Sequence, residues 1–180
     1  IDLTDDIVIT VKLTISSSCI LSLYGNNFSK SDKKVLNKKK QWVLTAFRDP
    51  DSYERHKGNR EVGITLYDID KNTAFIHIFR QKKNVFACDD LLALNDTYLN
   101  ENANWKEQYN STAVAPIRYY ENNTDKYLYY GLVAVDSLNK GKYQLFQNEE
   151  TRHILGHAAD LLANYFLALS IIPGGRNEKS

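Results

Sequence analysis

The sequence predicts one α+β domain in which several β-strands are followed by a long helix. Residues 127–135 (YLYYGLVAV) are apolar almost throughout, which is typical of a strand buried on both faces at the centre of a sheet. Residues 149–172 carry apolar side chains three or four positions apart, which is the spacing of an amphipathic helix. The 180 residues of the chain suffice for one domain with its own core.

The charge balance indicates which partners to expect, and the cysteines indicate the cellular compartment. The formal net charge is +1, from 23 Lys and Arg against 22 Asp and Glu, so we expect no nucleic-acid partner. Cys19 and Cys88 lack a metal-binding spacing, and we expect free thiols in a cytoplasmic protein. Because the chain begins at Ile1 and contains no Met, we also expect it to be part of a longer protein.

Residues 1–60 are predicted to form an N-terminal extension with a basic helix. Residues 7–23 are apolar and β-branched apart from Lys12, which favours a strand or a docking helix. The alternative is the inner end of a membrane anchor upstream, although a full span needs about 20 apolar residues. Residues 29–47 have helical features, with Ser29 or Ser31 as the cap and a lysine-rich, solvated face over residues 33–40.

Residues 62–79 and 111–119 have sequence features that favour β-strands. Residues 62–69 and 74–79 are rich in β-formers and flank the polar residues 70–72, so they predict an antiparallel hairpin. On this hairpin His77 would be a partly exposed strand residue. Residues 111–119 predict a further strand with Pro116 near its end, where a missing donor is tolerated.

Gly131 interrupts the apolar run 127–135. A glycine inside a strand marks a bulge or a close approach of another backbone. We therefore expect one of these two features at Gly131.

The predicted last helix has two apolar sides. Asn148 is its expected cap, and the helix is followed by a tail over residues 173–180. One apolar stripe contains Ile154, Ala158, Leu161, Tyr165, Ala168 and Ile172, and an adjacent stripe contains Leu155, Leu162, Phe166 and Leu169. A helix with two apolar sides usually has two burial partners, so we expect the sheet on one side and the second subunit of a homodimer on the other.

Several short patterns in residues 109–170 resemble the closing half of a GAF-type sensor domain. They are residues 111–117 (STAVAPI), residues 130–136 (YGLVAVD), Phe146 and residues 158–163 (AADLLA). The resemblance implies a GAF/PAS-like fold over residues 61–172. This fold has a central antiparallel sheet with helices packed on one face, a pocket-covering loop on the other, and a long C-terminal helix.

The resemblance also implies a class of function. Members of the GAF family bind cyclic nucleotides, tetrapyrroles, haem, amino acids or small metabolites, and many only dimerise. Phe86, Asp89 and Asp90 match the cyclic-nucleotide pattern only in part, and no Cys–His pair suits the attachment of a bilin. Cys88 alone is also insufficient for the methionine-sulfoxide reductases of the family. The ligand and any cofactor therefore stay unnamed.

Residues 84–110 are the predicted pocket-lining segment. They combine aromatic and acidic side chains without a steady period, a mixture that suits a ligand pocket. The candidate ligand-binding residues are Phe86, Asp89, Asp90, Tyr98, Trp105 and Tyr109. The alternative interpretation is that these aromatic side chains only anchor a long loop.

His153, His157 and Asp160 are the strongest alternative site. Their spacing places them on one face of the last helix, as metal ligands require. However, Ile154 stands where a zinc protease carries its catalytic glutamate. We prefer a solvated polar stripe and predict no metal.

Together these observations predict a non-enzymatic sensory or regulatory GAF-like domain. It would bind an unknown small molecule, or form a homodimer, or both, and signal to another domain. One alternative is a structural protein-interaction domain without a ligand. The other is a metal-dependent enzyme that uses the histidines of the last helix.

Overall fold

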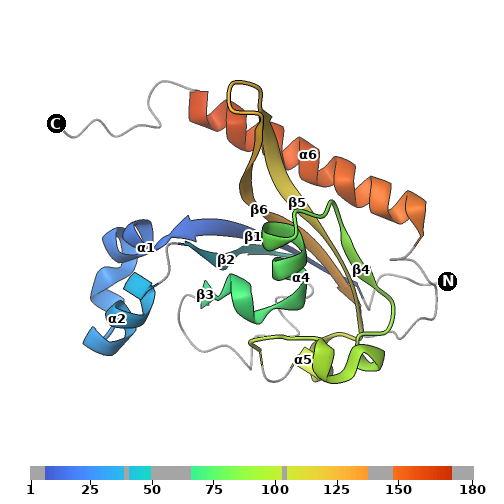
Figure 1. Cartoon of the computed structure of the whole chain (residues 1–180), viewed down its shortest axis with the longest axis horizontal. Coiled ribbons are helices and arrows are strands. Elements are labelled where there is room, and N and C mark those ends of the chain that lie inside the picture. The colour runs from blue at the N-terminus through green and yellow to red at the C-terminus, as the bar shows by residue number, and fades with distance from the viewer. Residues whose placement is uncertain (1–6, 39–40, 50–65, 103–104, 138–147, 172–180) are drawn as a thin grey trace.

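The computed structural model describes residues 7–38, 41–49, 66–102, 105–137 and 148–171, which build one six-stranded sheet (Figure 1). The strand order is β3-β2-β1-β6-β5-β4, and every described pairing is antiparallel. The strands are β1 (Ile7–Ser16), β2 (Gln41–Arg48), β3 (Leu66–Tyr67), β4 (Phe86–Cys88), β5 (Ser111–Glu121) and β6 (Lys126–Ser137). The predicted α+β fold class and the central position of β6 are confirmed.

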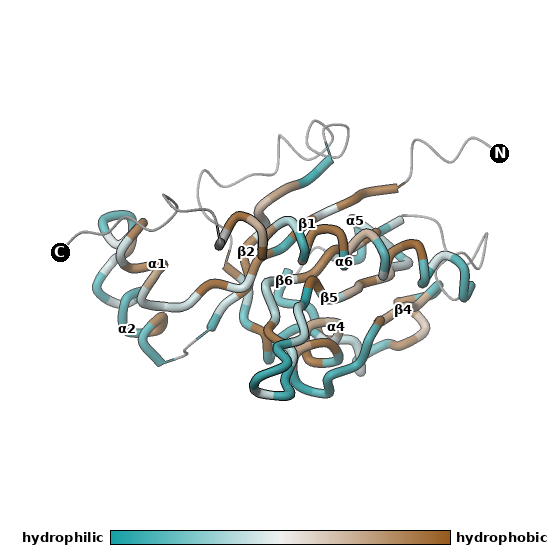
Figure 2. Tube along the Cα trace, turned by 90° about the horizontal axis from the view of Figure 1, so that it is seen from above, coloured by the Kyte–Doolittle hydropathy of each residue, from teal (hydrophilic) through white to brown (hydrophobic). Residues whose placement is uncertain are grey.

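The helices are unequal in length and lie on different sides of the sheet. Between β1 and β2 are α1 (Ser17–Tyr24), η1 (Gly25–Asn27) and α2 (Lys30–Lys38), which lie at one end of the molecule in both views (Figures 1 and 2). Short helical turns between β3 and β5 are η3 (Ile69–Lys71), α4 (Thr73–Phe75), η4 (Ile76–Arg80), η5 (Leu92–Thr97) and α5 (Trp105–Gln108). The longest helix, α6 (Glu149–Ile171), runs along one face of the sheet.

Strands β5 and β6 are buried on both faces, which accounts for their continuous apolar sequence. Successive side chains of a strand point to opposite faces. On one face Ala113, Ala115 and Val133 pack against Leu155 and Ala159 of α6. On the other face the alternating residues pack against the short helices, and this cluster contains Val114, Leu132, Ala134, Phe75, Ile78 and Phe79.

Within the first sixty residues, the described segments Ile7–Ser16 and Gln41–Arg48 are strands of the sheet itself. They were expected to form an N-terminal extension, but β1 lies between β2 and β6 and pairs with both. Residues 7–16 are therefore a strand, which is one of the two structures expected for the apolar segment 7–23. Lys12 is tolerated in this inner strand because its side chain lies on the floor of a cavity, which is described below.

The helix predicted over residues 29–47 ends much earlier than expected. Ser29 caps α2 as predicted, since its Oγ accepts a bond of 3.2 Å from the amide of Asp32. The helix stops at Lys38, however, and Gln41–Arg48 is strand β2. Trp42, Val43 and Thr45 are aromatic or β-branched residues that suit a strand, and pairing along β1 outweighs their helical spacing.

The hairpin predicted from residues 62–69 and 74–79 is wrong, because strand β3 covers only Leu66–Tyr67 and pairs with β2. Residues 74–79 are helical, in α4 and η4, so His77 lies on a helical turn rather than on a strand. Asn72 caps this segment through its Oδ1, which accepts from the amide of Phe75 at 3.3 Å. Ala74, Phe75, Ile78 and Phe79 are all buried, a pattern in which pairs of apolar residues recur every four positions, as on a helix. Residues 62–65 lie outside the described residues.

Gly131 meets both expectations for a glycine within a strand. A Cβ atom at this position would lie 2.0 Å from the carbonyl oxygen of Lys12. The β5–β6 register also shifts between Ile117, which pairs with Gly131, and Arg118, which pairs with Tyr129. The close approach of β1 therefore requires a residue without a side chain.

Helix α6 has the predicted cap and two apolar sides, but the buried side includes Ala159 and Ala163, which were expected in neither stripe, and Leu169, expected beside Leu155, is 44% exposed. The Oδ1 of Asn148 accepts from the amide of Glu150 at 2.8 Å. The stripe with Leu155, Ala159 and Ala163 is buried against the sheet, whereas Ile154, Leu161 and Tyr165 remain 70%, 71% and 59% exposed. Figure 2 shows hydrophobic and hydrophilic residues alternating along this helix. None of the described helices has the length and apolarity needed to cross a membrane.

Candidate functional site

A polar cavity lies on the face of the sheet opposite α6. Its floor consists of inward-facing residues of four strands, namely Val8, Thr10, Lys12, Arg48, Thr112 and Asp136. The start of α4 forms one wall with Asn72, Ala74 and Phe75, and residues 98–102 contribute Tyr98, Asn100 and Asn102. The cavity has a volume of about 60 Å³, enough for about four to six waters.

The strand registers bring the charged residues of the floor together. Arg48 of β2 lies opposite Thr10 of β1, and Asp136 of β6 lies opposite Val8. Lys12 is two residues along β1 from Thr10 and so shares its face. Two cations and one carboxylate therefore surround a small space.

Burial changes the protonation equilibria of Lys12 and Asp136. Desolvation lowers the pKa of Lys12 to about 8, against the opposing influence of Asp136 and with a further lowering by Arg48. Desolvation also raises the pKa of Asp136, while a hydrogen bond from Thr112 and the charges of Lys12 and Arg48 lower it. Both residues retain partial exposure, and both line the cavity, so the cavity is where their charges meet solvent or a ligand.

The hydrogen bonds on the floor leave donor capacity unused. The ammonium of Lys12 donates to Thr45 Oγ1 at 2.8 Å and lies 4.5 Å from the centre of the Tyr67 ring. The hydroxyl of Thr112 donates to Asp136 Oδ1 at 2.5 Å. Thr10 is only 1% exposed, and its hydroxyl has no hydrogen-bond partner in the described structure. Buried polar groups normally have a partner, so this hydroxyl suits a water or a ligand atom in the cavity.

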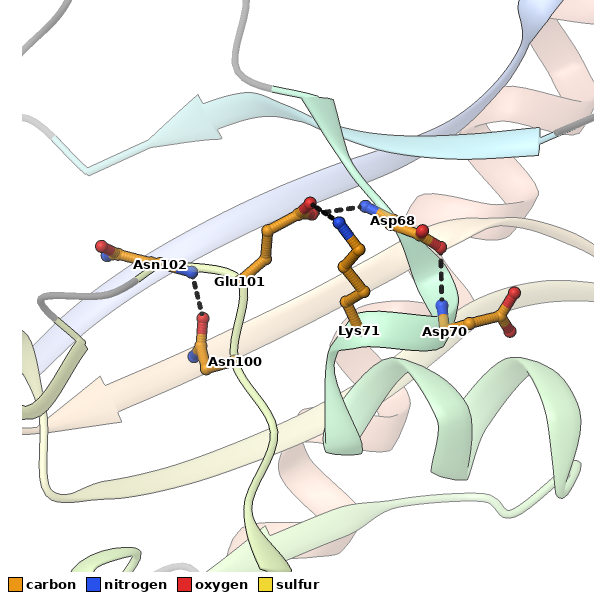
Figure 3. A network of polar contacts seen from close by, with 6 residues as sticks. All are labelled: Asp68, Asp70, Lys71, Asn100, Glu101 and Asn102. Carbon is orange, nitrogen blue, oxygen red and sulfur yellow. Dashed lines mark hydrogen bonds and ion pairs between the residues drawn. The ribbon is translucent and has the colours of Figure 1, made fainter. Parts of the chain in front are cut away.

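Residues 98–102, here called the strap, run across the rim of the cavity and are tied to the segment that begins α4. Glu101 accepts from the amide of Asp68 at 2.8 Å and from the ammonium of Lys71 at 3.1 Å (Figure 3). The amide of Thr73 donates to the carbonyl of Leu99 at 3.0 Å, and the Thr73 hydroxyl accepts from the amide of Leu99 at 2.8 Å. Asn100 Oδ1 accepts from the amide of Asn102 at 2.9 Å within the strap. These contacts fix the strap against the segment that begins α4.

Tyr98 and Tyr109 are the two predicted site residues that line the cavity. Asn100 donates to the hydroxyl of Tyr109. Desolvation raises the pKa of both phenols, so both remain neutral hydrogen-bonding groups at physiological pH.

The other predicted site residues lie away from the cavity lining. Phe86 stacks on Tyr98 with ring centres 6.3 Å apart, and Trp105 meets Tyr98 edge to face at 4.8 Å. Asp90 Oδ1 accepts from the amide of Ala93 at 3.1 Å, at the start of η5, and Asp89 is buried. Phe86, Tyr98 and Trp105 thus belong to one packed aromatic cluster of segment 84–110, of which Tyr98 also lines the cavity.

Sequence reasoning missed the floor of the cavity. Thr10, Lys12 and Arg48 were placed in a separate extension, and Asp136 was treated only as the end of a strand. One signal was present, since Thr10 and Lys12 alternate with the apolar Ile9, Val11 and Leu13. That alternation indicates a strand with one polar face.

The residues His153, His157 and Asp160 line a separate open cleft between α6 and β5. His153 is 69% exposed at its side chain and lies 3.8 Å from a Glu149 oxygen. Within the described residues, no three His, Cys, Asp or Glu side chains are grouped to hold a metal ion. All three side chains are exposed.

The comparisons with known proteins support the fold alone. No protein-family model matches the chain, and no curated protein matches it. Among solved structures, a far-red cyanobacteriochrome photoreceptor is similar over 93% of this chain and 79% of its own, with a TM-score of 0.52 and 12% identity. Because cyanobacteriochromes contain GAF domains, this likeness agrees with the α+β, GAF-like fold that the sequence predicts.

Proposed function

We propose that this chain is a non-enzymatic sensory domain that binds a small molecule in the polar cavity and signals to another domain as a homodimer. The observation that carries the proposal is the cavity itself. Its floor is charged, one of its buried hydroxyls lacks a partner among the described residues, and the strap, which is tied to the start of α4, lines it. The likeness to a photoreceptor agrees with a sensory role.

The size of the cavity limits the ligand. Space for about four to six waters suits a small metabolite and is far too small for a tetrapyrrole, one of the ligand classes implied by the GAF resemblance. The polar floor also disfavours an apolar ligand, because buried charges require polar partners.

Helix α6 supplies the proposed route to a second subunit. Its exposed stripe contains Ile154, Leu161, Tyr165 and Leu169, next to the stripe packed on β5 and β6. Exposed contiguous apolar surface commonly marks an interaction site. A ligand that alters the sheet under α6 would change the geometry of two paired helices.

We also propose that the domain works in the cytoplasm. Cys19 and Cys88 are both free, one exposed and one buried. Free thiols are ordinary in a reducing compartment.

One observation favours a second candidate, a structural interaction domain without a ligand. The aromatic cluster of Phe86, Tyr98, Trp105 and Tyr109 is packed with Leu91 and Cys88, so segment 84–110 is stable without a ligand beneath it. In that case the cavity holds only water, and α6 alone carries the function.

A thermal-unfolding screen with small metabolites distinguishes the two candidates. A ligand present at about 100 times its Kd should stabilise the protein by about 2.7 kcal/mol. The variant Ala134→Leu places a larger side chain in the cavity wall and should lose that response while it still folds. If no metabolite stabilises the wild-type protein, the sensory proposal fails; if the protein also stays monomeric, the interaction-domain candidate loses its support too.

A further inference from the structure

Helix α2 carries a stripe of exposed lysines. Lys30, Lys34 and Lys38 follow one another at intervals of four positions, so their side chains lie on one face of the helix. All three are exposed. Like charges at this spacing destabilise a helix, and a partner of opposite charge would relieve their repulsion.

The surrounding residues hold little negative charge. Residues 17–38, which form α1, η1 and α2, are here called the basic lobe. They contain four lysines and one carboxylate, Asp32, so the lobe has a net charge of +3 against +1 for the whole chain. Asp32 Oδ2 accepts from the amide and the hydroxyl of Ser29 at 3.1 and 2.6 Å. Within the described residues, none of the four lysines forms an ion pair.

The packing of the basic lobe turns the stripe outward. Leu36 is 4% exposed and packs with Ile20 and Trp42. Lys34 and Lys38 are each two positions from Leu36, which is nearly the opposite side of a helix with 3.6 residues per turn. Both views place α1 and α2 at one end of the molecule (Figures 1 and 2). The lysines are therefore open to a large partner.

Apolar side chains are exposed on the same lobe. Val35 is 54% exposed and precedes Lys38 by three positions, so the two side chains are neighbours on the helix. Leu23 of α1 is 63% exposed. A helix that combines lysines with exposed apolar side chains suits an anionic lipid surface, where apolar groups enter the boundary between headgroups and acyl chains. Helix α2 contains no aromatic residue on which nucleic-acid bases could stack.

We propose that the basic lobe binds an anionic lipid surface, with Lys30, Lys34 and Lys38 against the headgroups and Val35 at the interface. The cytoplasmic leaflet of a membrane has a negative surface potential that attracts lysines, which fits the proposed cytoplasmic location. None of the residues that line the polar cavity belongs to the lobe. The inference therefore goes beyond the sensory function and does not depend on it.

Co-sedimentation of the whole chain with vesicles tests the proposal. The vesicles consist of phosphatidylcholine alone, or of equal amounts of phosphatidylcholine and phosphatidylserine. We expect the protein to bind the vesicles with phosphatidylserine, and to bind phosphatidylcholine at least about tenfold more weakly. Salt at about 1 M, which screens charges beyond about 3 Å, should release the bound protein.

Substitutions in α2 locate the binding surface. The triple variant Lys30→Gln, Lys34→Gln and Lys38→Gln should bind about a hundredfold more weakly, because each lysine near an anionic surface contributes about fivefold. Val35→Gln, which changes no charge, should weaken binding by about two- to tenfold. Glutamine is a good helix former, and the unfolding midpoint confirms that each variant folds. Lys34→Gln alone, with an expected loss of about fivefold, remains informative if the triple variant does not fold.

A second triple variant is the matched control. It removes the same number of charges at exposed positions outside the lobe, namely Lys83→Gln, Lys106→Gln and Lys126→Gln. Its affinity for the vesicles should equal that of the wild-type protein, because the position of the lysines and not the net charge determines binding.

The outcomes separate lipid binding from the other possibilities. If the protein does not bind the vesicles with phosphatidylserine, or if the two triple variants bind them alike, the inference is wrong. A single-stranded RNA and a DNA duplex are the competing probes, and tighter binding of either through the same lysines also overturns it. None of these results bears on the cavity, whose sensory role the metabolite screen tests separately.

Discussion

Gly131 of β6 lies directly against the backbone of Lys12 in β1. A Cβ atom on Gly131 would lie 2.0 Å from the Lys12 carbonyl oxygen and 2.9 Å from the Cα of Leu13. This contact lies where Gly131 pairs with Leu13 in the β1–β6 register. The same register places Thr10 and Lys12 on the cavity floor beside Asp136.

Gly131→Ala should destabilise the protein, because β1 must move to make room for the methyl group. Overpacking of this kind costs about 1–3 kcal/mol, and we expect a loss in the upper part of that range because the atoms in the way belong to the backbone. Chemical denaturation measures the change in the free energy of unfolding. An unchanged stability would show that β1 does not approach Gly131 this closely.

Gly156→Ala is the matched control. Gly156 lies within α6, and an added Cβ would meet nothing within 4 Å. Alanine is favoured over glycine in a helix by about 0.5–1 kcal/mol, so this variant should be slightly more stable than the wild-type protein.

The depressed pKa of Lys12 should make stability depend on pH in the alkaline range. The folded pKa is about 8 against 10.5 for an unperturbed lysine, so between these values the unfolded chain binds more protons. The free energy of unfolding should then rise with pH across this window, by about 1–3 kcal/mol. Asp136, Arg48 and Tyr67 face Lys12 from β6, β2 and β3. All three side chains are present in both the wild-type protein and Lys12→Gln, so the comparison isolates the loss of the Lys12 ammonium. That variant should lack the rise, and an equal pH dependence in both proteins would refute the assignment to Lys12.

Leu161→Lys should weaken the proposed homodimer. Leu161 is 71% exposed at the centre of the apolar stripe, and a lysine there would bury a charge on association. Sedimentation equilibrium should give a dimer dissociation constant at least about tenfold larger than that of the wild-type protein. Asn164→Lys places the same charge on the polar side of α6 and should have little effect. If both variants associate like the wild-type protein, α6 is not the interface.

Glu101→Gln should loosen the strap without unfolding the domain. It removes the ion pair with Lys71 and weakens the bond to the Asp68 amide, and an exposed pair of this kind contributes only about 0–1 kcal/mol. Hydrogen exchange should become faster at the amides of Asp68 and Leu99, while the amides of β5 and β6 keep their protection. Glu107→Gln, on the exposed side of α5, is the control. Unchanged exchange at both amides would mean that Glu101 does not hold the strap.

Local patterns were sufficient for the second half of the fold. The continuous apolar run of β6 and the capped helix α6 are each defined by residues close in sequence, so periodicity and capping predicted them. Gly131 was also informative, because a glycine within an otherwise apolar strand usually marks a bulge or a close approach of another backbone. The two apolar sides of α6 were predicted because helical spacing determines which residues share a face, although Leu169 was assigned to the buried side and is exposed.

The first half and the candidate site depend on contacts between distant residues. Trp42 and Val43 form a strand because they pair with Ile15 and Thr14 of β1, which their own helical spacing does not indicate. Residues 74–79 are a short segment, so the helical period and the strand period are hard to distinguish in it. The cavity floor needs four strands in the correct order, and no local pattern specifies that Lys12, Arg48 and Asp136 meet.

The most direct measurement of the central claim is a titration of the isotope-labelled chain with the small metabolites of the thermal-unfolding screen, followed by NMR amide shifts. The account predicts that the shifted amides cluster at Thr10, Lys12, Thr112 and Asp136 on the floor and in the described strap residues 98–102, and that the shifts disappear in Ala134→Leu. If these metabolites shift no amides, or only amides remote from this cavity, the claim that the cavity is a sensory ligand site is contradicted.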